Sequence, residues 1–147
     1  MRGVIFSFLT LALAAGAQVG GQPPQPYTPK QGDAERRAIT DALRAPVEKQ
    51  LKQKVVFRVD HLKVQADWAF LRGTPRRPDG GEIDYKGTPY WDAVDARAFD
   101  DGIVALLQKR KGRWQVVQFV VGATDVPYVD WHEKYRAPSA IFEGDDQ

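Results

Sequence analysis

The stretch from Gly102 to Gly122 constrains the fold more than any other part of the sequence. It reads GIVALLQKRKGRWQVVQFVVG, two apolar runs separated by a short basic turn that ends in glycine. Runs of this kind are typical of β-strands, and a glycine supplies the positive φ that a tight turn between two strands needs. The stretch therefore predicts a β-hairpin at the centre of a sheet.

Both faces of this hairpin are apolar. On the first strand Ile103, Ala105 and Leu107 point to one side, and Val104 and Leu106 point to the other. On the return strand, strict alternation predicts two apolar sets on opposite faces of the sheet. One set is Trp114, Val116 and Val120, and the other is Val117, Phe119 and Val121. A sheet that is apolar on both faces must be covered on both faces, and a single helix covers only one of them.

Residues 34–52 are predicted to form the helix that covers the first face. Asp33 is a favourable N-cap, and apolar side chains then recur every four residues: Ile39, Leu43, Val47 and Leu51. Pro46 lies inside this pattern. Because proline lacks a backbone N–H and crowds the preceding turn, we expect a kink or a break there.

Residues 54–65 and 68–73 predict a second hairpin with a tight turn at Ala66 and Asp67. The apolar alternation of the first of these strands changes phase halfway, which predicts a bulge near Asp60 and His61. With the central hairpin, this defines the expected fold class: α+β, with one N-terminal helix packed on a curved four-stranded antiparallel sheet.

Two irregular segments rich in aromatic residues, 74–101 and 123–142, flank the central hairpin. A loop of the first segment's length is uncommon unless it packs on the sheet or acts as a lid over a ligand. We expect short regular elements within 91–98 and within 129–134. The second face of the sheet must be covered by the aromatic loop, by the C-terminal segment or by a second subunit, which leaves a homodimer through the sheet open.

The beginning of the chain predicts export. Residues 1–17 combine an early arginine, an uncharged apolar run and a small-residue cleavage pattern, which is typical of a signal peptide. Residues 18–32 then form a disordered tether, 33–142 a single α+β domain and 143–147 a frayed tail. The expected location is periplasmic or secreted, with no membrane span after cleavage.

The order of helix, hairpin, irregular segment and long hairpin resembles that of the cystatin-like and NTF2-like superfamily. The similarity is carried by DHLKVQADWAFLRG (60–73) and by ALLQKRKGRWQVVQFVVG (105–122). It implies a helix lying against a curved antiparallel sheet. The group includes isomerases, dehydratases, inhibitors and plain binding modules, so the resemblance implies a fold rather than one activity.

The composition argues against several kinds of chemistry. The sequence has no cysteine and only two histidines, which argues against a zinc site and removes any thiol nucleophile. Ser139 lacks the glycines of a nucleophile elbow. The formal net charge of +2 does not suit a dedicated nucleic-acid binder. We therefore expect no metal, no cofactor and no nucleic-acid partner.

Acid/base catalysis is the enzymatic alternative, because the resemblance implies a carboxylate, alone or with a histidine, at the mouth of the sheet. Burial there raises the pKa of a carboxyl group towards neutrality. The candidates for this role are Asp60, His61 and Asp125, followed by Asp100, Asp101, Asp130 and His132. Most aspartates are ordinary turn or capping residues, which is the competing interpretation of each.

The binding hypothesis rests on residues of the two irregular segments. Aromatic side chains with polar tips give a large contact area at low entropic cost, as protein and sugar interfaces require. They serve equally well to cover the second face of the sheet. The candidates are Tyr85, Tyr90, Trp91, Tyr128, Trp131 and His132. The predicted function is a small binding or accessory module of the cell envelope, with an envelope protein, a peptide or a glycan as partner.

Overall fold

The computed structural model describes residues 21–144. The predicted signal peptide at 1–17, and residues 145–147 of the predicted frayed tail, lie outside the described part. The elements follow in the order α1 (Ala34–Leu51), β1 (Val56–Gln65), β2 (Trp68–Arg76), α2 (Trp91–Asp95), β3 (Ile103–Arg110), β4 (Arg113–Val121), α3 (Trp131–Tyr135) and the 3-10 turn η1 (Ser139–Ile141). This order confirms the α+β class.

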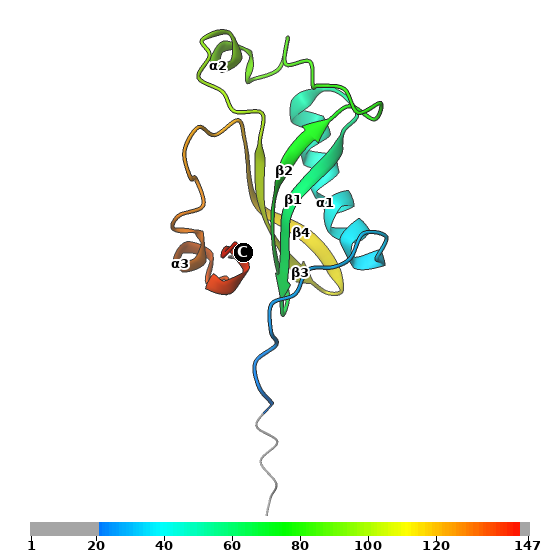
Figure 1. The fold of residues 1–147 in the computed structure, drawn as a ribbon, viewed down its shortest axis with the longest axis vertical. Helices are drawn as coiled ribbons and strands as arrows, with labels where there is room; N and C mark the ends of the chain where they lie inside the picture. Colours follow the sequence, from blue (N-terminus) through cyan, green and yellow to red (C-terminus); the bar gives the residue numbers. More distant parts are fainter. Residues whose placement is uncertain (1–20, 145–147) are drawn as a thin grey trace, which may run out of the picture.

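The four strands form one antiparallel sheet in the order β1-β2-β3-β4. α1 lies across one face of the sheet, and the C-terminal segment with α3 and η1 lies on the opposite side (Figure 1). Both predicted hairpins are present. Ala66 adopts a φ of 51° in the first turn, and Lys111 and Gly112 adopt φ values of 50° and 75° in the second, as tight hairpin turns require.

Each hairpin contains a register shift. The predicted bulge in β1 is confirmed, because Val59 pairs with Gly73 whereas His61 pairs with Arg72, leaving Asp60 as the extra residue. A second shift lies in β4, where Val117 is the extra residue.

The β4 bulge overturns part of the predicted alternation. Phe119 and Val121 pack on the helix side, and Val120 packs on the opposite side. One extra residue reverses every side chain that follows it, because the side-chain period of a strand is two.

α1 presents its apolar positions to the sheet as the sequence predicts. The side chains of Ile39, Leu43 and Val47 are fully buried, and Leu51 is nearly so. The helix continues through Pro46, so the predicted break does not occur. Leu43 and Val47 are buried on either side of Pro46, and this packing offsets the backbone bond that the proline cannot make.

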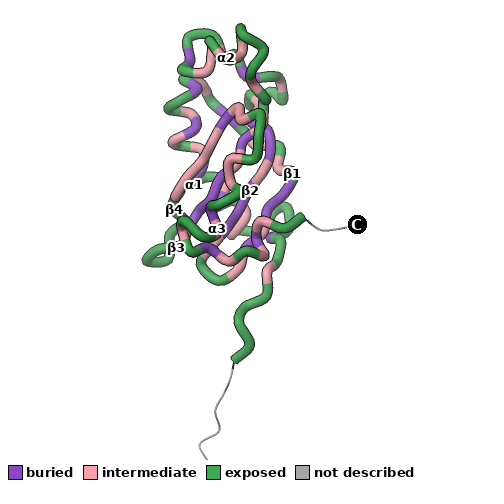
Figure 2. The backbone as a smooth tube through the Cα atoms, turned by 90° about the vertical axis from the view of Figure 1, so that its left-hand side faces the viewer, coloured by how far each residue is buried: buried purple, intermediate pink, exposed green. Residues whose placement is uncertain are grey.

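The C-terminal segment covers the second face of the sheet. Phe70 and Leu106 on the sheet form a buried cluster with Trp131, Ala137 and Ile141. The two central strands, β2 and β3, are consequently buried along much of their length, as Figure 2 shows in purple. The chain thus supplies its own cover for the face that the helix leaves open.

The aromatic loop does not share in covering that face. Tyr85, Tyr90 and Phe99 pack against the core on the helix side, so of the three covers considered for the second face the loop is not the one used. The loop leaves the end of β2 and returns to β3 beyond the C-terminal end of α1. The loop is hydrogen-bonded to residues at the end of α1, and its aromatic side chains add to the core on the helix side. The short elements expected within 91–98 and around 129–134 correspond to α2 and α3.

The predicted tether is in contact with the end of β1, where Gln65 Nε2 donates to the Pro24 carbonyl at 2.9 Å. Tyr27 exchanges two backbone hydrogen bonds with Val64 of β1, both 2.8 Å long. Its hydroxyl also donates to Glu35, which raises the pKa of Tyr27 to about 12. Among residues 21–144, no helix combines the length and the apolar character needed to cross a bilayer.

Candidate functional site

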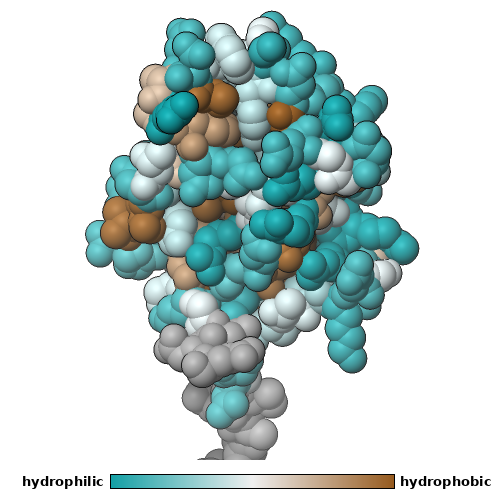
Figure 3. Space-filling model, turned by 45° about the horizontal axis from the view of Figure 1, so that its top comes forward, coloured by the Kyte–Doolittle hydropathy of each residue, from teal (hydrophilic) through white to brown (hydrophobic). Residues whose placement is uncertain are grey.

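A cleft of about 720 Å³ opens where the long loop leaves β2 and returns to β3. We call it the aromatic cleft. Its lining combines aromatic rings, carboxylates and a single arginine: Pro75, Arg76, Glu82, Ile83, Asp84, Tyr85, Trp91, Val94, Phe99, Asp100, Asp101 and Thr124. Figure 3 brings this end of the molecule forward and shows its apolar side chains as separate patches bordered by hydrophilic ones.

The aromatic rings of the cleft are held by one another and by a glycine. The Tyr85 and Phe99 ring centroids lie 4.6 Å apart, and those of Tyr85 and Tyr90 lie 6.5 Å apart. Gly122 has a φ of 80°, and a Cβ at this position would lie 1.9 Å from Cε2 of Phe99. Only glycine therefore allows the Phe99 ring to lie this close to the end of β4.

Polar bonds tie the loop to the end of α1. The side-chain amide of Gln53 donates to the Asp84 carbonyl at 2.7 Å, and the Asp84 N–H donates to Gln53 Oε1 at 3.2 Å. Lys52 Nζ donates to the Gly87 carbonyl at 2.8 Å. The wall of the cleft is thus fixed to the helix rather than free to swing.

The electrostatic character of the aromatic cleft is acidic. Arg76 is its one cationic side chain, with Nη2 lying 3.4 Å from Asp101 and Nη1 3.9 Å from Glu82. Asp84 and Asp100 line the cleft with no ion pair among the described residues. Burial, followed by the negative charge of Asp101, raises the pKa of Tyr85 to about 12, so this hydroxyl is neutral at physiological pH.

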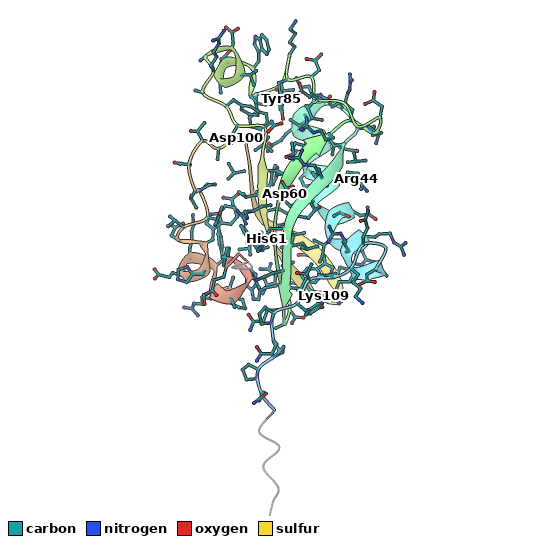
Figure 4. The ribbon with its side chains drawn as sticks, viewed as in Figure 1. Arg44, Asp60, His61, Tyr85, Asp100 and Lys109 are labelled. Carbon is teal, nitrogen blue, oxygen red and sulfur yellow. The ribbon has the colours of Figure 1, made fainter. Side chains whose placement is uncertain are left out.

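A second, smaller cleft of about 410 Å³ lies on the other face of the sheet, and we call it the polar cleft. Asp100 and Asp101 line both clefts and so form the partition between them. Figure 4 shows Tyr85 beside Asp100 at the upper end of the strands, with Asp60 lower on β1. The polar cleft is lined by Arg58, Asp60, Arg72, Gly73, Thr74, Asp100, Asp101, Gly102, Ile103, Val104, Val120, Ala123, Asp125, Val126, Pro127 and Tyr128. Many of these residues are charged.

The polar cleft brings together two of the predicted catalytic candidates. The β1 bulge places Asp60 on one wall, and the segment after β4 places Asp125 on the other. Asp60 lies 3.5 Å from Arg58 Nε and is 57% exposed; Asp125 is also exposed. A carboxylate that acts as a general base near neutral pH needs burial, which neither side chain has.

The third catalytic candidate, His61, has a structural contact instead. Its ring is buried, and Nε2 lies 2.9 Å from the Ile141 carbonyl, to which it donates because a carbonyl only accepts. The ring also meets Phe70 edge-on at 5.6 Å. His61 therefore ties the C-terminal segment to β1.

The predicted binding residues are divided between the clefts and the core. Tyr85 and Trp91 line the aromatic cleft, and Tyr128 lines the polar cleft. Trp131 is buried beneath the C-terminal segment.

The other two predicted binding residues line neither cleft. The Tyr90 hydroxyl donates to Gln50 on α1, and burial raises the pKa of Tyr90. His132 on α3 lies 3.7 Å from Glu133.

Several cleft residues were not singled out by the sequence. Arg72 and Arg76 are the clearest cases, since both lie on β2 and face a cleft. Nε of Arg72 is buried with no hydrogen-bond partner in the described part of the chain. The available signal was a charged residue inside an otherwise apolar strand, which usually marks a solvent-facing position.

Within residues 21–144, no three histidine, cysteine, aspartate or glutamate side chains lie close enough together to hold a metal ion. No known protein family, curated protein or solved structure matches the chain. The site must therefore be interpreted from its own geometry.

Proposed function

We propose that the protein is a binding module of the cell envelope that takes a cationic group of its partner in the aromatic cleft, without a cofactor. One observation carries the proposal: carboxylates and aromatic rings line the same cleft, and Arg76 is the one cationic side chain among its described lining residues. Aromatic faces attract cations through their quadrupole, and carboxylates attract them directly. The cleft is also as large as ordinary ligand pockets, which measure about 300–1,000 Å³.

The chain's own contacts support this chemistry. Lys86 Nζ lies 5.8 Å from the centre of the Trp91 ring, so one face of this ring already attracts an ammonium group. A lysine or arginine side chain of a partner protein or peptide meets the same requirement within the cleft. An uncharged glycan stacks on Trp91 without needing the acidic groups, which makes it the alternative ligand to test.

The location belongs to the same proposal. Its support is the signal-peptide pattern of residues 1–17, from which we expect the mature protein in the periplasm or outside the cell. Expression of the full chain followed by fractionation and N-terminal sequencing tests it. A mature N-terminus at Gln18 is expected, and an intact Met1 in a cytoplasmic fraction contradicts export.

The superfamily is likewise a proposal. A single helix on a four-stranded antiparallel sheet of sequential hairpins is the arrangement that the cystatin-like and NTF2-like resemblance implies. The curvature of the sheet belongs to this expectation. Members of such a superfold host many activities, so the site and not the fold carries the functional argument.

The binding test uses the full chain and short peptides in a salt series. A peptide with two arginines or lysines is expected to bind and to change the tryptophan fluorescence, whereas a glutamate peptide and a neutral oligosaccharide are not. Trp91→Ala is expected to weaken binding at least tenfold. Equal binding of the neutral sugar at all salt concentrations overturns the cationic ligand in favour of the glycan.

A pair of exposed glutamates provides the matched control. Glu82 lines the aromatic cleft and its side chain is 90% exposed, while Glu133 lies on α3 and is 80% exposed. Both substitutions to lysine change the net charge equally. Only Glu82→Lys is expected to weaken binding of the cationic peptide. If Glu133→Lys weakens binding equally, the net charge of the whole protein attracts the peptide, and the aromatic cleft does not.

The alternative is an acid/base enzyme of the isomerase or dehydratase kind. The observation in its favour is that Asp60 and Asp125 line one cleft with Arg72. The geometry favours it less, because both carboxylates are exposed and His61 Nε2 is engaged by Ile141. Turnover of a carbonyl substrate that is lost in both Asp60→Asn and Asp125→Asn establishes this function instead.

A further inference from the structure

A groove of about 500 Å³ lies between the first half of α1 and the beginning of β1, and it shares only Arg58 with the polar cleft. Its charged lining residues are Arg36, Arg37, Arg44 and Arg58, with no acidic residue among those that line it. Phe57 and Val59 contribute apolar surface from the strand. The groove is thus basic along its walls and apolar at its floor.

β1 is an edge strand, and its outer edge is capped at two points, one near each end. The Val55 N–H, just before the strand, donates to Glu48, and the Val55 carbonyl accepts from Arg44 Nε at 3.1 Å. At the other end, Val64 is paired with Tyr27. Outward-facing and inward-facing residues alternate in an antiparallel strand, so Phe57 and Val59 face the same side as Val55.

Between these two caps the outer backbone groups are open. Phe57 and Val59 have no outer hydrogen-bond partner within the described residues, and the bulge at Asp60 ends this segment. Unpaired strand edges are templates for another extended chain. The chain itself demonstrates this at Val64, where Tyr27 adds to the same edge with two bonds of 2.8 Å.

The arginines differ in how far they are already neutralised. Arg44 forms an ion pair with Asp41, and Arg58 Nε lies 3.5 Å from Asp60. Arg36 donates to the Pro29 carbonyl at 3.1 Å, and Arg37 is exposed without an ion pair in the described chain. A positive excess therefore remains beside the open edge.

We propose that this open edge of β1 binds an acidic peptide in an extended conformation, which adds to the sheet as a further strand. Its backbone bonds the outer groups of Phe57 and Val59. Alternate side chains of an added strand point to opposite faces of the sheet, so acidic residues on the helix side meet Arg37 and Arg44. The side chains between them point to the opposite face of the sheet, away from the groove.

The favoured partner is a peptide because the edge offers alternating N–H and C=O groups, which match a peptide backbone. A polyanion such as heparin recognises the arginines alone and has no need of the strand edge. This difference decides between the two classes of ligand. The open edge of β1 and the aromatic cleft are separate sites with different lining residues, so the acidic peptide and the cationic ligand are independent proposals.

The test uses the isotope-labelled full chain and a capped peptide of about six residues that alternates glutamate with valine. Binding that weakens with salt, with amide shifts concentrated at Phe57 and Val59, is the expected result. The same peptide with N-methyl groups on alternate amides loses the backbone bonds and is expected to bind at least tenfold more weakly. Unchanged affinity of the methylated peptide, or no binding of the parent peptide, overturns the proposal.

Two variants separate the local charge from the charge of the whole protein. Arg37→Glu removes an arginine that no described contact requires for folding, and it is expected to weaken the peptide at least tenfold. Arg113→Glu makes the same charge change on the exposed start of β4 and is expected to leave the affinity within twofold. Equal loss in both variants, or heparin binding more tightly than the peptide and shifting no strand amide, contradicts strand addition.

Discussion

The two faces of the sheet are covered in different ways. On the helix side, α1 contributes apolar residues at regular intervals, and Ile39, Leu43 and Val47 meet the sheet with no exposed surface. On the opposite side, an irregular segment gathers aromatic rings around Phe70 of β2. The helix α1 covers one face, and individual side chains of the irregular C-terminal segment cover the other.

The difference lies in what holds each cover in place. α1 is an 18-residue helix with its own backbone hydrogen bonds along most of its length. The C-terminal segment has only one short helix and one 3-10 turn, so its position depends on ring contacts and on the His61 bond to Ile141. The centroids of Tyr128 and Phe142 lie 4.8 Å and 4.6 Å from that of Phe70. We infer that the tail side is the less autonomous of the two covers.

The largest expected effect comes from Phe70→Ala. This side chain is fully buried, and its removal takes the central ring from the tail cluster, which costs about 3–5 kcal/mol of unfolding free energy. Urea denaturation followed by tryptophan fluorescence measures the loss. Leu43→Ala, the matched change on the helix side, is expected to cost about 2–5 kcal/mol. A loss below about 1 kcal/mol for Phe70→Ala would mean that the tail does not pack on this face in solution.

Gly122→Ala comes next and tests the loop that extends the helix side. Gly112→Ala introduces a left-handed alanine into open space and is expected to cost about 1–2 kcal/mol. Gly122→Ala has the same backbone cost and also drives a methyl group into Phe99, which adds about 1–3 kcal/mol. Thermal unfolding of both variants gives the difference, and equal losses would show that Phe99 does not lie against Gly122.

His61→Leu has a smaller, local effect. The Ile141 carbonyl loses a buried donor, so the expected cost is about 1–3 kcal/mol. Hydrogen exchange should accelerate in residues 128–142 more than in α1. His132→Leu serves as the control and is expected to stay within about 0.5 kcal/mol. Uniform acceleration across the molecule after His61→Leu would contradict a separate tail anchor.

The smallest effect concerns alkaline pH. The pKa of Tyr85 is 10.0 when unperturbed and about 12 in the fold, because burial disfavours the charged form. The unfolded chain thus releases this proton first, and stability falls as the pH rises from 10 towards 12. Tyr85→Phe is expected to make this fall shallower. Tyr27→Phe should act in the same direction, because its pKa is also raised to about 12. A pH profile that is unchanged in Tyr85→Phe contradicts a buried hydroxyl.

Much of the helix side could be predicted from the sequence. The repeat of Ile39, Leu43, Val47 and Leu51 identified both the helix and its buried stripe, and the phase change in β1 identified the bulge at Asp60. The β4 bulge could not be predicted in this way. Val116 and Val117 are both apolar, so the sequence shows no change of phase where the register shifts.

The candidate site was less predictable than the fold. The sequence pointed to Tyr85, Trp91, Asp60 and Asp125, and the structure distributes them over two clefts that share a wall. It did not point to Arg72 or Arg76, because an arginine within a strand has the same appearance whether it faces a cleft or solvent.

The sequence alone determined the elements of this protein, since helix and strand periodicities are local properties of neighbouring residues. It also required that both faces of the central hairpin be covered, since valine, leucine and isoleucine occupy both odd and even positions of its strands and so point to both faces. Only the tertiary structure decided that the C-terminal segment covers the second face and that the aromatic loop joins the helix side. That choice depends on contacts between residues far apart in the chain, such as His61 with Ile141, which no local pattern encodes.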